Sequence, residues 1–162
     1  MNFKDLLKTF LSSSGPNKIE PYLQLMNFAS EHRLTEELIK DVFNALDTAT
    51  PSETIVLIHL LSKQALFQSP LYASNQLQQT FNQIQSYPSH LVLQFIDSLN
   101  GFVAHEACSR WVIQFIIDQV QTQLKSTYAE AYQKAINQII KAHPTLEGIE
   151  LLKHVKKGQF SS

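Results

Sequence analysis

The stretch 105–125 constrains the fold of this chain more than any other part of it. Read as a helix, it gathers most of its polar residues on one stripe, and apolar side chains cover most of the remaining circumference. The stripe is formed by Arg110, Gln114, Asp118, Gln121 and Lys125. A helix that is apolar over so much of its surface must be surrounded by other helices. We therefore predict an all-α fold around 105–125 as its central hydrophobic helix, which at about 1.5 Å per residue is long enough to cross a small domain.

Proline, glycine and serine divide the rest of the chain into further amphipathic segments. The clearest boundaries lie at 12–16, 47–51, 69–70, 87–89 and 143–144. Asn100 and Gly101 mark another expected helix end, because both residue types accept left-handed backbone dihedrals. The sequence shows no strand-like alternation and no hairpin signature. It therefore predicts an irregular bundle of about eight helices, or a short HEAT-like stack of antiparallel helix pairs.

The chain divides into three predicted parts. Residues 1–14 form an amphipathic segment that is either a helix packed on the body or a detachable arm. Residues 17–157 are expected to form a single all-helical domain, since 162 residues suit one domain with its own core. Residues 158–162 are predicted to be a flexible tail.

Composition limits the classes of partner and compartment. The formal net charge is −1, from 13 basic and 14 acidic residues, so no global field favours nucleic acid. The apolar runs are too short to span a bilayer, and the N-terminal segment does not resemble a signal peptide. A single cysteine excludes an internal disulfide. We expect a cytoplasmic protein, or one delivered into a host cytosol.

Catalytic motifs are weak throughout. His105 and Cys108 lie one helical turn apart and could form a nucleophilic pair, but Cys108 falls on the apolar arc, which favours a packing role. The histidines form no i, i+4 pair, and the chain has no glycine-rich phosphate loop. We therefore predict no catalytic, cofactor or metal site. The candidate pocket or interface residues are His59, His90, His105, Cys108 and Tyr72.

The first functional hypothesis is a protein-interaction module that binds a partner helix or peptide through a surface groove. Adaptors, secretion chaperones and secreted effector-type domains belong to this class. The hypothesis rests on the glutamine-rich, half-exposed helix expected at 71–85 and on the segment 1–14, which is placed to cover a hydrophobic groove.

Two alternatives remain from the sequence. One is a small-ligand or catalytic bundle, whose signature is a pocket where polar groups with shifted pKa values converge. Its candidate groups are His59, His90, His105, Tyr22, Tyr72 and Tyr128. The other is a homodimer formed through an exposed apolar patch on the last two helices.

Overall fold

The computed structural model describes residues 2–64, 69–105, 108–122 and 126–154, and every regular element within these ranges is helical. This confirms the all-α prediction. The first half contains α1 (Phe3–Ser12), the 3-10 helix η1 (Gly15–Lys18), α2 (Ile19–Glu31), α3 (Glu36–Leu46) and α4 (Pro51–Lys63). The second half contains the 3-10 helix η2 (Pro70–Ala73), α5 (Asn75–Ile84), α6 (Ser89–Ile96), α7 (Leu99–Val103), α8 (Ser109–Thr122), α9 (Ser126–Ala142) and α10 (Ile149–His154).

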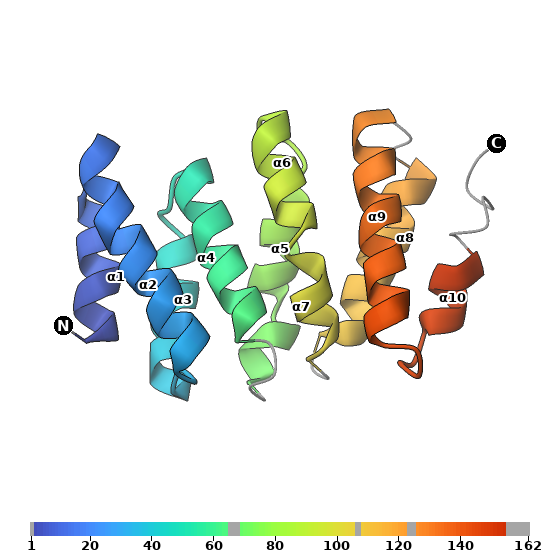
Figure 1. The fold of residues 1–162 in the computed structure, drawn as a ribbon, viewed down its shortest axis with the longest axis horizontal. Coiled ribbons are helices and arrows are strands. Elements are labelled where there is room, and N and C mark those ends of the chain that lie inside the picture. Colours follow the sequence, from blue (N-terminus) through green and yellow to red (C-terminus); the bar gives the residue numbers. More distant parts are fainter. Residues whose placement is uncertain (1, 65–68, 106–107, 123–125, 155–162) are drawn as a thin grey trace.

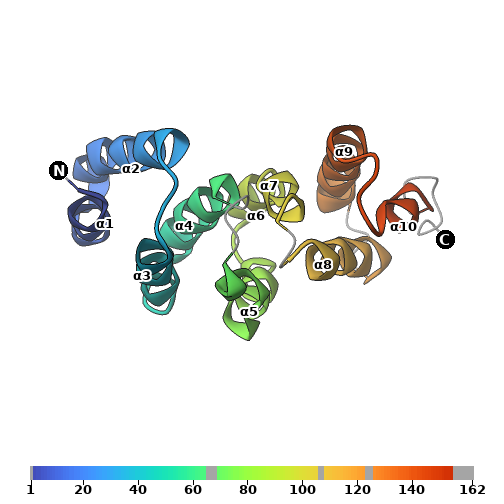
Figure 2. The same ribbon diagram turned by 90° about the horizontal axis from the view of Figure 1, so that it is seen from below.

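The helices form two layers of a short row of antiparallel pairs (Figures 1 and 2). One layer contains α1, α3, α5 and α8, and the other contains α2, α4, α6 with α7, and α9. The row is bowed, so that the layer of α2, α4, α6–α7 and α9 lies on its concave side (Figure 2). Rows of stacked helix pairs expose extended concave surfaces of this kind, and many such proteins bind partners there.

The helix predicted at 105–125 corresponds to α8, which begins at Ser109 and is buried over most of its circumference. Its predicted polar stripe is exposed at Arg110, Gln114, Asp118 and Gln121. However, α8 lies toward the C-terminal end of the row, and α5, α6 and α7 take the middle position (Figure 1). α4 packs against α2, α3, α6 and α7. The apolar residues around most of α8 therefore predicted that other helices surround it. They did not predict its position in the row.

The segment 1–14 contains a packed helix. α1 contacts both α2 and α3, and its apolar face is buried. The side chains on that face are Phe3, Leu6, Leu7 and Phe10. The Asn2 side chain caps the helix by accepting a hydrogen bond from the Asp5 backbone N–H. The tail predicted at 158–162 lies outside the described residues.

Gly101 does not end a helix, contrary to the expectation from its sequence. It lies inside α7, and its φ is not positive. A Cβ atom at this position would lie 2.5 Å from the backbone oxygen of Ser62 in α4. The glycine therefore allows the backbones of α4 and α7 to approach closely, rather than allowing a left-handed turn.

This geometry reverses the usual effect of replacing a helical glycine. Helix propensity alone predicts that Gly101→Ala stabilises the protein by roughly 0.5–1 kcal/mol. Because the new methyl group would meet a backbone carbonyl that cannot rotate away, we expect a loss of about 2–3 kcal/mol instead. Urea unfolding followed by far-UV circular dichroism measures the sign. Gly15→Ala is the control: its Cβ would meet nothing within 4 Å, and only its positive φ of 57° imposes a cost of about 1 kcal/mol.

Buried amides connect successive helix pairs. Gln64, directly after α4, is only 5% exposed. Its Nε2 donates to the backbone oxygens of Ala29, at 2.6 Å, and His32, at 3.0 Å, while its Oε1 accepts from the Leu34 N–H at 2.9 Å. In the same way, Gln76 of α5 donates to the Phe43 oxygen near the end of α3. These amides satisfy carbonyls at helix C-termini, which have no partner within their own helix.

Candidate functional site

A groove on the concave layer is the leading candidate site. It consists of two adjoining hollows between α2, α4 and α6 that share Tyr22, Val56 and Gln94. We call the first the His59 hollow, of about 230 Å³, and the second the Phe10 hollow, of about 300 Å³. The His59 hollow is also lined by Ile55, His59 and Asp97. The Phe10 hollow is also lined by Phe10, Lys18, Ile19, Ser52 and Glu53.

Ile19 and Tyr22 form one edge of this groove, and they belong to an apolar stripe on α2. Ile19, Tyr22, Leu23 and Met26 follow the i, i+3, i+4, i+7 spacing of a single helix face. Ile19 is 59% exposed and Leu23 is 48% exposed, and both are among the few large apolar side chains that the described structure leaves so open to solvent. Buried Leu25 and Ala29 lie next to Tyr22 around the helix, since Ala29 follows it by seven residues. α2 therefore has one wide apolar arc, and the protein covers the part around Leu25 and Ala29 but leaves Ile19 and Leu23 exposed.

The His59 hollow contains polar groups with fixed positions. The His59 side chain is half-buried in the middle of α4, and its Nδ1 lies 3.1 Å from the Ser98 hydroxyl between α6 and α7. Burial, and secondly the nearby Lys63, lower the pKa of His59 against an opposing effect of Asp97. The imidazole is therefore mainly neutral at pH 7. Asp97 is exposed at the C-terminal end of α6 and is the acidic side chain that lines this hollow.

An internal ion pair forms part of the wall of the Phe10 hollow. The Lys18 ammonium lies 2.7 Å from a Glu53 carboxylate oxygen and donates to the backbone oxygens of Phe10 and Ser13. Glu53 also accepts from the Thr50 N–H, which completes the capping box at the start of α4. Burial alone raises the pKa of Glu53, but the hydrogen bonds from Lys18 and Thr50 outweigh it and hold the pKa below its usual value. Lys18 therefore joins the end of α1 to the start of α4.

The Lys18→Met variant tests this connection. It removes the Lys18 donor from Glu53 and from two backbone carbonyls, so we expect a loss of about 2 kcal/mol in the free energy of unfolding at pH 7. Because pairing lowers the pKa of Glu53 in the folded state, its contribution is present above the ordinary value of 4.5 and is lost as the pH falls through the folded-state pKa. The gap between the variant and the wild type should therefore shrink at pH 3, as measured by urea unfolding.

Lys8→Met, on the exposed face of α1, is the matched control and should change stability little at either pH. A Lys18→Met gap of equal size at pH 7 and pH 3 would contradict the ion-pair account.

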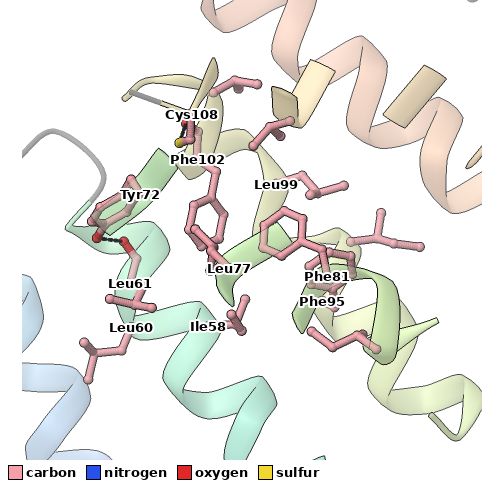
Figure 3. Packing of buried hydrophobic residues seen from close by; sticks show 14 of the residues in the cluster. Ile58, Leu60, Leu61, Tyr72, Leu77, Phe81, Phe95, Leu99, Phe102 and Cys108 are labelled. Atoms are coloured by element: carbon pink, nitrogen blue, oxygen red, sulfur yellow. Dashed lines mark hydrogen bonds between the residues drawn. The ribbon is translucent and has the colours of Figure 1, made fainter. Parts of the chain in front are cut away.

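Three of the predicted candidate residues are buried in the core rather than at a surface, and Figure 3 shows two of them, Tyr72 and Cys108. The Tyr72 hydroxyl donates to the Leu61 oxygen at 2.7 Å, and its ring stacks on that of His105 with centroids 4.3 Å apart. His105 Nε2 accepts from the Ser69 N–H. The Cys108 thiol donates to the Phe102 oxygen at 3.0 Å. Tyr72, His105 and Cys108 therefore hold η2 against α4 and α7.

This environment does not favour a nucleophilic cysteine. Burial raises the pKa of the Cys108 thiol to about 12, so the thiolate is scarce at neutral pH. Burial also raises the pKa of Tyr72 far above its usual value. The packing role that the sequence favoured for Cys108 agrees with this geometry. Of the remaining candidates, His59 lines the groove, and His90 is exposed in the first turn of α6.

The sequence pointed only partly to the groove. Tyr22 was a candidate group for a ligand pocket, and it lines both hollows while it is half-buried against the core. Asp97 and Gln94 were not predicted, and α5, which contains most of the glutamine-rich segment 71–85, lies in the opposite layer (Figure 2). The available signal was the width of the apolar arc of α2, because a wide apolar arc needs more than one neighbour to cover it.

The fold and groove define an all-α protein of layered antiparallel helix pairs with an apolar and acidic groove on its concave side. Within the part of the chain that the structure describes, no group of three His, Cys, Asp or Glu side chains is placed to hold a metal ion. In the same ranges, no helix has the length and apolarity that a membrane crossing requires. Comparison with family models, curated proteins and solved structures finds no match to this chain.

Proposed function

We propose that this protein is a non-enzymatic interaction module that binds a helix or peptide segment of another protein in the concave groove. The observation that carries the proposal is the apolar stripe of α2 beside two adjoining hollows. Exposed large apolar side chains that border a groove are characteristic of protein-binding surfaces. A bound segment would cover Ile19 and Leu23 and place side chains in the hollows. Adaptor, secretion-chaperone and effector-type roles are all compatible with such a site.

The alternative of a small-ligand or catalytic pocket has less support. His59 and Tyr22 do converge on one hollow, and the pKa of His59 is shifted. However, about 230 Å³ is less than the roughly 300–1,000 Å³ of ordinary ligand pockets. Tyr72 and His105 use their polar atoms on backbone groups in the core. The geometry therefore favours side chains of a protein partner as the occupants.

A substitution of Ile19, at the edge of the groove, tests the proposal. A random linear-peptide display library is selected against the wild-type protein, and the affinities of the enriched peptides are measured by fluorescence anisotropy. Ile19→Asp should weaken binding at least tenfold, which is about 1.4 kcal/mol, because it places a charge where an apolar contact forms. The fold should be unchanged, since Ile19 is exposed.

Leu151→Asp is the matched control. Leu151 is 56% exposed, nearly as much as Ile19, but lies on α10 at the other end of the row (Figure 1). It should leave peptide binding unchanged. Enriched peptides that bind Ile19→Asp and the wild type equally would refute the concave groove as the binding site. A failure of the library to yield any specific peptide would count against the interaction module itself.

A further inference from the structure

The charge of the groove indicates which protein segments it accepts. In the Phe10 hollow, Lys18 and Glu53 neutralise each other at 2.7 Å, so the apolar part of the lining is formed mainly by the side chains of Ile19, Tyr22 and Val56. Phe10 itself is 2% exposed beneath the Lys18 ammonium. This hollow, of about 300 Å³, has the lining expected for a large aliphatic or aromatic side chain.

The His59 hollow has the opposite character. Its lining combines the Tyr22 ring, the Gln94 amide, the neutral His59 imidazole and the Asp97 carboxylate. Among the salt bridges within the described ranges, none involves Asp97. Among the residues that line this hollow, Asp97 is therefore the one acidic group, beside an aromatic ring and an amide oxygen, and the nearby Lys63 does not line it. A lysine or arginine side chain matches all three features, because its stem packs on the ring while its head pairs with the carboxylate.

The two hollows adjoin, since both are lined by Tyr22, Val56 and Gln94. Resting on the function proposed above, we propose that the groove recognises a protein segment in which a lysine or arginine neighbours a large apolar residue. The basic side chain enters the His59 hollow and pairs with Asp97, and the apolar side chain enters the Phe10 hollow. Tyr22 lies at the boundary and contacts both side chains.

Peptide selection with charge variants tests this specificity. Peptides enriched on the wild-type protein should contain a Lys or Arg next to a large apolar residue, and selection on Asp97→Asn should lose the basic residue. For one enriched peptide, Asp97→Asn should weaken binding about fivefold, in keeping with the loss of a partly exposed ion pair. Asp97→Lys should weaken it further. A peptide with Glu in place of its basic residue should bind Asp97→Lys more tightly than it binds the wild type.

Glu130→Gln is the matched control, because Glu130 is an exposed carboxylate of α9 in the same layer but outside the groove. It should leave the affinity unchanged. Peptides that depend on Ile19 but show no basic residue, together with an unaltered affinity for Asp97→Asn, would overturn this inference and leave the interaction module standing. Loss of all groove-dependent binding would overturn both. A dimer in sedimentation velocity that Asp97→Lys dissociates would identify a second copy as the occupant, which also contradicts the inference.

Discussion

Deletion of residues 1–14 is expected to lower the free energy of unfolding by about 4 kcal/mol or more and to make the protein prone to aggregation. Four side chains on one face of α1 are buried against α2 and α3. Burial of such side chains contributes about 1.5–3 kcal/mol each, offset in part by the conformational entropy lost when α1 becomes ordered. Deletion would also expose the apolar surfaces of α2 and α3 that α1 covers.

Urea unfolding and light scattering of the truncated protein measure both effects. Two point variants separate the contribution of packing from that of deletion. Leu6→Ala should lose about 2–5 kcal/mol, because it leaves a cavity in a buried interface. Lys8→Ala, on the exposed face, should stay within about 0.5 kcal/mol of the wild type. A truncated protein with an unchanged unfolding midpoint would instead identify 1–14 as a detachable arm.

Gln64→Glu is expected to lose about 4 kcal/mol at pH 8, although the two side chains have nearly the same shape. The substitution replaces the Nε2 donor by an oxygen that faces the carbonyl oxygens of Ala29 and His32. It also places a charge at a site that is only 5% exposed. A buried charge without a compensating partner is among the most costly changes in a protein interior.

The pH dependence of this variant identifies the cause. Burial next to carbonyl oxygens raises the folded-state pKa of the new carboxyl above its unfolded value of about 4.3. The folded state is then favoured by protonation, so the stability lost at pH 8 should return in part as the pH falls toward 4. Gln79→Glu, at an exposed position of α5, should change stability by less than about 0.5 kcal/mol. A Gln64→Glu deficit that does not change with pH would rule out the buried-charge explanation.

Local signals predicted the helices well where capping chemistry and periodicity coincide. Threonine is a residue type that caps helices, and the Thr35 hydroxyl accepts from the Leu38 N–H at the start of α3. Polar residues predicted to be exposed on α8 are exposed. Predictions of helix ends that relied on a single residue type were less reliable. Gly101 was read as a helix end, but the glycine serves the contact between α4 and α7.

The candidate site was harder to predict than the helices, because it combines faces of helices that are distant in the sequence. Tyr22, His59 and Asp97 come from three helices, and none of them forms a local motif with another. Tyr72, His105 and Cys108 were grouped as candidates for their chemistry, yet the fold buries all three. The residue types thus indicated which side chains could take part in chemistry or binding. They did not indicate whether those side chains are accessible to a partner.

The sequence by itself determined the all-α class, the approximate helix boundaries and the face of most helices that is buried, since periodicity and capping act within a few residues of the chain. Only the tertiary structure decided that α5, α6 and α7 lie in the middle of the row and that a stripe of α2 borders a groove beside Asp97. The physical reason is that the hydrophobic effect is not directional. An apolar helix face must be covered, but its sequence does not specify which helix covers it. The packing of all the helices against one another decides that, and it leaves some apolar faces exposed.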